Sequence, residues 1–219
     1  MRAFGLAALG CALGAVLPFR GQAQDVGARL AGRAPGEVVR AVQDIARGAA
    51  TDGLPVEPLI QKAIEGSAKG VAPDRVVAAV RMLAARLGEA QGALRDAGIA
   101  APSGEAVEGG AYALDAGLNA GQVRDLARVS RPPYDPALML RVAATLGALG
   151  VPGPQAVRLM QGMIKTGRTP SDLLALPSKA QADMARGATP AEAAEGLARG
   201  APHIPPGGSR RPSTGPQNP

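Results

Sequence analysis

Apolar residues recur at spacings of three and four along most of this chain, which is the spacing of one face of an α-helix. No stretch has the alternation of apolar and polar residues that is typical of a half-buried strand. The pattern predicts an all-α protein with no β-sheet. Helices are predicted over 35–49, 55–68, 73–97, 104–116, 120–130, 136–149, 154–166, 170–185 (with a restart or kink at Pro177) and 190–199.

The longest predicted helix carries a narrow apolar stripe along one face. Its members follow one another at spacings of four and three: Val76, Val80, Leu83, Leu87, Ala90 and Leu94. Such a stripe is typical of a helix packed in the core against antiparallel neighbours. The alternative is an exposed seam that binds a partner.

Two similar segments near the C-terminus, GRTPSDLL and GATPAEAA, predict how helices begin. In each, a threonine is followed by proline and, three residues after the threonine, by a carboxylate. We predict that Thr169 and Thr189 are N-caps and that Asp172 and Glu192 complete capping boxes. Proline suits the first helical position, because its missing N–H would have no helical partner there.

Glycine stands where the preceding helices end, and it is suited to close them in the left-handed conformation. The same punctuation recurs along the chain at Gly53, Gly70, Gly117, Gly150, Gly167 and Gly187, and Asn119 is a further predicted cap. Because the spacing between these glycines varies, no solenoid with a fixed period is expected. The sequence predicts an array of short helical hairpins with turns punctuated by Gly and Pro.

Composition divides the chain into four parts. Residues 1–23 are predicted to be a signal peptide and residues 24–34 an N-terminal linker. Residues 35–200 form the helical domain, with a candidate hinge near 100–106. Residues 201–219 are rich in Pro and Gly and are expected to be a disordered basic tail.

The N-terminal segment has the layout of a secretory signal. Arg2 precedes an apolar run from Ala3 to Phe19, and small residues lead to an expected cleavage after Ala23. The predicted location is therefore periplasmic or secreted. The alternative is that the segment is retained as a membrane anchor; a lipid anchor on Cys11 fits the sequence less well.

Charge and aromatic content argue against nucleic acid as a partner. The whole chain has a formal net charge of +6, but part of the excess lies in the signal segment and in the tail, at Arg210 and Arg211. After removal of the signal, Tyr112 and Tyr134 are the only aromatic residues and no cysteine remains. The folded part is thus nearly balanced in charge, has only these two aromatic residues for base stacking and has no cysteine with which to form a disulfide.

Few residues are available for catalysis. The single histidine, His203, lies between prolines of the tail, and no cluster of His, Cys and carboxylates has the spacing of a metal site. Glu105 and Glu108 share one helical face, and we interpret them as complements of the helix dipole rather than as an acid and a base. From the sequence we therefore predict that the protein is not an enzyme. We predict no catalytic, cofactor-binding or metal-binding residues and no cofactor.

One charged segment is a candidate for binding. Lys62, Glu65 and Lys69 in KAIEGSAKG fall on one helical face at spacings of three and four. The alternative interpretation is an ordinary ladder of solvated ion pairs.

A longer stretch resembles a known kind of protein. GLPVEPLIQKAIEGSAKGVAPDRVVAAVRMLAARL and EGGAYALDAGLNAGQVRDLARV are similar to exported, Ala- and Gly-rich helical proteins of high-GC bacteria, which have no assigned function. The resemblance covers about residues 36–177 and rests on spaced Gly and Pro together with Lys62, Ala63, Glu65 and Gly66. It implies a helical fold and no activity, substrate or site.

Two functional hypotheses follow. The first is an exported, non-enzymatic scaffold or binding protein of the bacterial envelope, with a grooved face that binds another protein or an envelope polymer. The second is a peripheral envelope-surface protein tethered by its basic Pro-rich tail, with at most peripheral membrane contact. The sequence indicates no oligomeric state.

Overall fold

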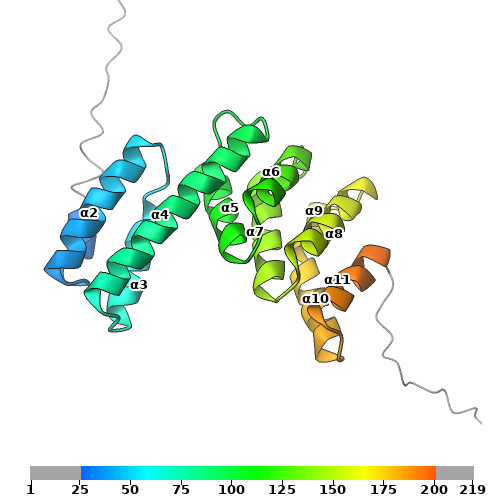
Figure 1. Ribbon diagram of the computed structural model, residues 1–219. Coiled ribbons are helices and arrows are strands. Elements are labelled where there is room, and N and C mark those ends of the chain that lie inside the picture. The colour runs from blue at the N-terminus through cyan, green and yellow to red at the C-terminus, as the bar shows by residue number, and fades with distance from the viewer. Residues whose placement is uncertain (1–25, 201–219) are drawn as a thin grey trace, which may run out of the picture.

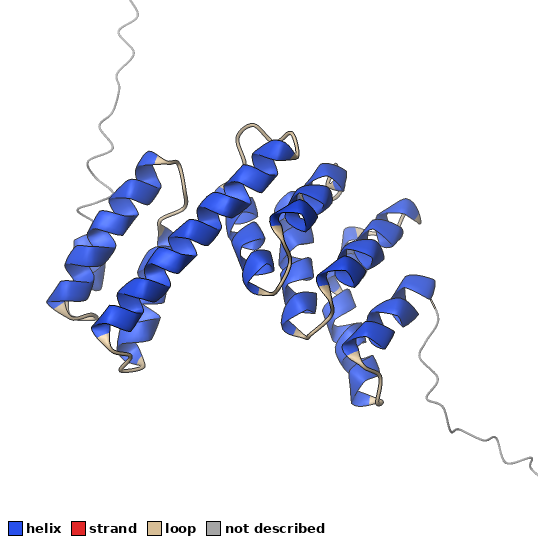
Figure 2. Ribbon diagram, in the orientation of Figure 1, coloured by secondary structure: helices blue, strands red, loops and turns tan. Residues whose placement is uncertain are grey.

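The computed structural model describes residues 26–200, and all regular structure within them is helical (Figure 2). The predicted all-α array of helical hairpins is confirmed. The predicted signal segment and tail lie outside the described residues. A short helical stretch at residues 26–30 precedes ten helices. These are α2 (Gly36–Thr51), α3 (Glu57–Ala68), α4 (Pro73–Asp96), α5 (Gly104–Asp115), α6 (Ala120–Val129), α7 (Pro136–Ala148), α8 (Gly153–Lys165), α9 (Pro170–Leu174), α10 (Leu176–Ala185) and α11 (Pro190–Arg199).

The predicted helix over 170–185 is in fact two helices. α9 ends at Leu174, and α10 begins at Leu176 with Pro177 in its first turn. Proline has no N–H to donate into a preceding turn, and its ring clashes with the carbonyl four residues before it, so a helix restarts there more readily than it continues. The predicted restart at Pro177 is confirmed.

The folded domain begins before the range predicted for it. Residues 26–30 fall in the stretch assigned to a linker, but they are helical, and Val26 and Leu30 are buried. These apolar side chains join the core, so this stretch belongs to the domain. The range 100–106 spans the end of the α4–α5 loop and the start of α5, and one cluster of buried side chains extends on both sides of it.

The helices lie in two rows (Figure 1). In the row nearer the viewer, α2, α4, α6, α8 and α11 pack side by side, each against the next. The row behind contains α3, α5, α7 and the α9–α10 pair, and the contacts of α5 with α7 are the most extensive. Successive hairpins therefore stack along one direction, and α2 and α11 stand at opposite ends of the array.

Seven turns between helices share one hydrogen-bond pattern. At each, a glycine with φ between 67° and 100° follows the helix, and its N–H and that of the next residue donate back to carbonyls of the last turn. This is the Schellman motif, whose left-handed residue glycine adopts without steric cost. The glycines are Gly53, Gly70, Gly98, Gly117, Gly150, Gly167 and Gly187. The residue after the glycine is apolar in six of these turns; in the seventh it is Arg168.

The predicted N-caps are present. The hydroxyl of Thr169 accepts from the N–H of Asp172, and the Asp172 carboxylate accepts from the N–H of Thr169 at 3.0 Å. Thr189 and Glu192 form the same capping box at the start of α11. Asn119 is the predicted cap of α6 and also forms a capping box. Each box satisfies backbone donors that the first helical turn leaves free.

The core is built from Leu, Val, Ala, Met and Ile side chains. All six members of the apolar stripe on α4 are buried, so the prediction that they are core residues is confirmed. Tyr134 packs against the edge of this core, and its hydroxyl donates to the carbonyl of Arg168 at 2.7 Å. The many Ala and Val side chains of this core each remove little area from water, so the core requires close approach of the helices.

Two adjacent glycines allow α5 to approach both of its main neighbours. A Cβ atom on Gly110 would lie 2.8 Å from the Cβ of Ala90 in α4. One on Gly109 would lie 3.2 Å from the carbonyl oxygen of Ala137 and from the Cβ of Leu140, both in α7. Hydrogen is therefore the only substituent that fits at Gly110 without a shift of the backbone.

We expect Gly110→Ala to destabilise the protein by roughly 1–3 kcal/mol, the usual cost of overpacking a core. The matched control is Gly88→Ala on the exposed face of α4, where an added Cβ has no neighbour within 4 Å. That change should be neutral or stabilising by up to about 1 kcal/mol, because alanine favours a helix over glycine. Urea unfolding measures both. Equal effects of the two substitutions would contradict close packing at Gly110.

Candidate functional site

Three adjoining hollows follow the row formed by α3, α5, α7 and α9–α10. Their volumes are about 550, 460 and 720 Å³. Tyr112 and Asp115 line both the first and the second, and Arg141 and Thr145 line both the second and the third. The hollows are therefore parts of one continuous depression, which we call the groove.

The groove exposes apolar side chains. Among the described residues, four large apolar side chains are exposed, and three of them line the groove: Met82 (63% exposed), Tyr112 (44%) and Leu174 (60%). Met82 lies on α4 beside Leu83, where α4 forms the floor between α3 and α5. Exposed apolar side chains that gather in a depression, rather than being scattered singly, indicate a binding surface.

One face of α5 supplies the polar wall of the groove. Glu105, Glu108, Tyr112 and Asp115 follow one another at spacings of three, four and three, so they point in a similar direction from the helix. The opposite face of α5 carries the glycines that contact α4 and α7. α5 thus buries a face made mostly of Gly and Ala, with Val107 and Leu114, and presents its carboxylates to the groove.

The groove is acidic although the whole chain has a net charge of +6. Six carboxylates and two cationic side chains line it. The carboxylates belong to Glu57, Glu65, Glu105, Glu108, Asp115 and Asp135, and the cations to Lys62 and Arg141. The resulting potential attracts cations and repels anions.

Some of these carboxylates have partners within the protein. Asp115 lies 3.4 Å from Arg86 on α4, and Asp135 caps α7 through the N–H of Ala137 at 2.7 Å. Glu105 has no hydrogen bond or ion pair to its side chain among the described residues. The α5 wall therefore offers a carboxylate that an incoming cation would not have to compete for.

Glu57 at one end of the groove is held by a two-point ion pair. Arg29 donates to both of its carboxylate oxygens, one of them at 2.6 Å, and Gln61 donates at 2.7 Å. The Arg29 hydrogen bonds, followed by that of Gln61, lower the pKa of Glu57 to about 2. This pair joins the short helical stretch at residues 26–30 to α3, which closes that end of the array.

Glu108, in the first hollow beside α3, behaves differently. Its partial burial raises the pKa of its carboxyl, and the charges of Glu105 and Glu57 act in the same direction, while Arg141 opposes them. Partial removal from water also strengthens the interaction of the ionised carboxylate with a cation placed beside it. Glu108 is therefore the carboxylate from which we expect the largest response to a bound cation.

The charged segment on α3 is a ladder of ion pairs, as the alternative interpretation predicted. Glu65 pairs with Lys69 and lies 3.8 Å from Lys62. Lys62 and Glu65 nevertheless line the groove, whereas Lys69 does not. The sequence analysis had thus singled out Lys62 and Glu65 as binding candidates, and it had interpreted Glu105 and Glu108 as complements of the helix dipole; all four residues line the groove.

Other groove residues were not identified from the sequence. Met82 is an apolar residue off the buried stripe of its helix, and Leu174 follows the buried Leu173 on a helix too short to bury both. In both cases an apolar residue off the buried face of its helix could have indicated an exposed apolar surface. Nothing in the sequence distinguished Arg141, because an exposed arginine on an amphipathic helix is common.

Two hydroxyl side chains of the groove are bonded to backbone carbonyls. The hydroxyl of Thr145 donates to the carbonyl of Arg141 in its own helix at 2.9 Å, and that of Ser178 donates to the carbonyl of Ala175, just before α10, at 3.0 Å. Within residues 26–200, no three His, Cys, Asp or Glu side chains are grouped so as to hold a metal ion. Over the same residues, every helix is too short or too polar to span a membrane.

Comparison of the chain with models of protein families, with curated proteins and with solved structures finds no match.

The Arg29–Glu57 pair should stabilise the protein in a pH-dependent way. Because folding lowers the pKa of Glu57 from 4.5 to about 2, its contribution is complete above pH 4.5 and is lost as the pH falls towards 2. Both side chains are substantially exposed, so we expect Glu57→Gln to cost no more than about 1 kcal/mol at pH 7. Urea unfolding of both proteins across this pH range measures the difference.

Glu37→Gln is the control, because Glu37 has no ion pair among the described residues. The stability difference between wild type and Glu57→Gln should vanish near pH 2, whereas that for Glu37→Gln should remain small throughout. A Glu57→Gln difference that is the same at pH 7 and pH 2 would mean that the ion pair is not its source.

Proposed function

We propose that this chain is an exported, non-enzymatic binding protein of the bacterial envelope, and that its groove binds a basic segment of another protein. Export rests on the signal-like N-terminal sequence. Binding rests on the groove, which is acidic and partly apolar although the chain has a net positive charge.

The charge distribution favours a cationic partner. Carboxylates on α3, on α5 and at the start of α7 surround the depression; Glu108 lines its first hollow and Glu105 its third. Charge complementarity of this kind accelerates association and selects among partners. A carboxylated envelope polymer would be repelled by the same surface.

The exposed apolar side chains favour a peptide segment over a simple polycation. Met82, Tyr112 and Leu174 are spread along the groove rather than gathered at one point. A segment with Lys or Arg at some positions and apolar side chains at others would satisfy both kinds of surface. Methionine and tyrosine suit such a role, because methionine adapts its shape and tyrosine has an apolar ring with a polar end.

The absence of an evident reaction centre in the groove supports binding rather than turnover. The hydroxyls of Thr145 and Ser178 are bonded to nearby backbone carbonyls, and the only histidine of the chain, His203, lies outside the described residues. A hydroxyl nucleophile needs a positioned base to become reactive.

We expect Glu105→Lys to weaken the binding of a basic peptide about tenfold, because it replaces an attraction by a repulsion in the wall of the groove. The probe is a fluorescein-labelled peptide of repeating Lys-Leu-Lys-Ala, and its counterpart has Glu in place of Lys. Fluorescence anisotropy with the chain from Gln24 onward measures both affinities, and the acidic peptide should not bind.

Glu37→Lys is the matched control. Glu37 and Glu105 are both exposed and both occupy the second residue of their helices, but only Glu105 lines the groove. Glu37→Lys should leave the affinity nearly unchanged. Equal losses of affinity in the two variants would mean that the net charge of the protein, and not the groove, governs binding. An affinity unchanged by Glu105→Lys would mean that the peptide does not bind in the groove.

The alternative of tethering by the tail is tested by a pull-down from the native envelope fraction. We expect a partner to be captured both by residues 24–219 and by a version that stops at Gly200, and to be lost with Glu105→Lys. Capture that requires residues 201–219 and weakens as salt rises would instead support tethering by the tail.

A further inference from the structure

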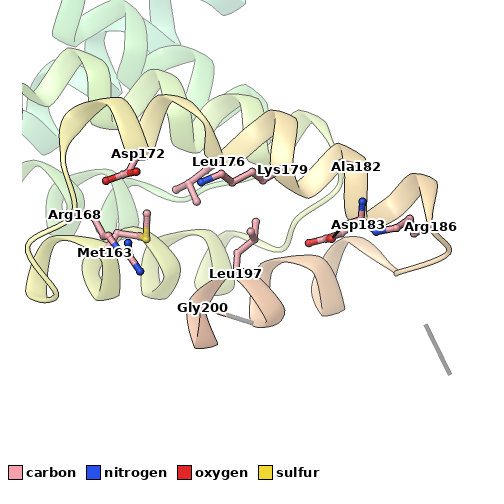
Figure 3. A pocket seen from close by; sticks show the side chains of 10 residues that line it. All are labelled: Met163, Arg168, Asp172, Leu176, Lys179, Ala182, Asp183, Arg186, Leu197 and Gly200. Carbon is pink, nitrogen blue, oxygen red and sulfur yellow. Dashed lines mark hydrogen bonds and ion pairs between the residues drawn. The ribbon is translucent and has the colours of Figure 1, made fainter. Parts of the chain in front are cut away.

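A separate cavity of about 310 Å³ lies at the C-terminal end of the array (Figure 3). It is bordered by α8 and the turn after it, by α9 and α10, and by the end of α11, and it opens to solvent on the side where Arg168 and Lys179 are exposed. α10 separates it from the groove: Pro177, Ser178 and Gln181 face the groove, whereas Leu176, Lys179 and Asp183 line the cavity. No residue lines both.

The cavity has an apolar lining. Met163 and Leu197 extend into it from α8 and α11, and Leu176 extends from the opposite side (Figure 3). Leu176 is buried, and the other two are partly buried. A ligand held there would lie against these side chains with its apolar portion.

Both carboxylates of the cavity already have partners. Asp172 accepts from the backbone N–H and the hydroxyl of Thr169, each at 3.0 Å. Asp183, only 3% exposed, pairs with Arg186. These acids are therefore committed to the fold, to the start of α9 and to the last turn of α10.

Two cations of the cavity have no such partner. The side chains of Arg168 and Lys179 make no hydrogen bond or ion pair among the described residues. Both lie close enough to Asp172 to lower the pKa of its carboxyl, after the larger effect of the hydrogen bonds from Thr169. With three cations and two carboxylates around the cavity, a single bound anion would balance the charge.

The position of Arg168 departs from a local rule that the rest of the chain follows. It occupies the residue after the glycine in a Schellman turn, a site that is apolar in the other six such turns. The Tyr134 hydroxyl, bonded to its carbonyl at 2.7 Å, holds this turn from the α6–α7 loop. A cation placed on a fixed backbone where an apolar side chain is the norm points to a role beyond folding.

We propose that this cavity binds a small amphipathic carboxylate, with its carboxyl group between Arg168 and Lys179 and its apolar portion against Leu176 and Leu197. The volume suits roughly ten non-hydrogen atoms if each takes the ~30 Å³ of a water molecule in the liquid. Residues 201–219 contain no Asp or Glu, so their side chains do not supply this carboxylate.

The test uses octanoate as the probe, below its micelle concentration, with the chain from Gln24 onward and isothermal titration calorimetry. Octanoate should bind saturably. Acetate, which lacks the apolar portion, and 1-octanol, which lacks the charge, should bind at least about tenfold more weakly, because each retains only one of the two interactions. Failure of octanoate to bind, or equal binding of 1-octanol, would overturn the proposal.

Variants locate the site. Arg168→Gln and Lys179→Gln should each weaken octanoate binding about tenfold, the loss expected for one charge-assisted hydrogen bond. Lys165→Gln is the matched control, because Lys165 is exposed at the end of α8 and does not line the cavity. Unchanged urea midpoints confirm that the variants fold. An equal loss of octanoate affinity in Lys165→Gln would mean that any nearby positive charge attracts octanoate, and it would refute this site.

The proposal does not depend on the groove. Glu105→Lys should leave octanoate binding unchanged, because Glu105 lies on α5 and outside the cavity. Conversely, Lys179→Gln should leave the affinity for the basic peptide unchanged. A loss of both activities in either variant would indicate misfolding or a single shared site, and would contradict two separate sites.

Discussion

The close approach of α5 to α4 and α7, through Gly110 and Gly109, is the packing contact on which the arrangement of the array depends. The described core contains no Phe or Trp, and its Ala and Val side chains bury little area each. Such a core gains density only where helix backbones come near one another, since dispersion contacts fall away quickly with distance. α5 packs against α4 in the other row and against α7 in its own row, so its position sets the spacing of the middle hairpins.

The groove is a consequence of this packing. Because α5 is buried through small residues, its remaining face is free to carry Glu105, Glu108 and Asp115 beside the exposed Tyr112. α3 packs chiefly against α2 and α4, which leaves a hollow between α3 and α5 with Met82 on its floor. The same helix thus fixes the core with one face and shapes the acidic surface with the other.

Local features of the structure were predictable from the sequence, and long-range ones were not. Thr169, Thr189 and Asn119 act on residues within one turn of themselves, so their identity and spacing sufficed to locate helix starts. The glycine turns followed from a conformation that other residues rarely adopt. The groove, by contrast, requires knowing that Arg141 of α7 lies beside Asp115 of α5, and no spacing along the chain encodes that neighbourhood.

The distribution of charge separates the two proposed sites. The groove gathers carboxylates on one side of α10, while the cavity on its other side has Arg168 and Lys179 without protein partners. Electrostatic interaction between exposed charges is largely screened beyond a Debye length of ~8 Å at physiological salt. A cationic segment in the groove and an anion in the cavity would lie on opposite sides of α10, since no residue lines both sites. α10 has Pro177 in its first turn, and its buried Asp183 pairs locally with Arg186 at its end, so both ends of the helix that separates the two sites are defined by its own residues.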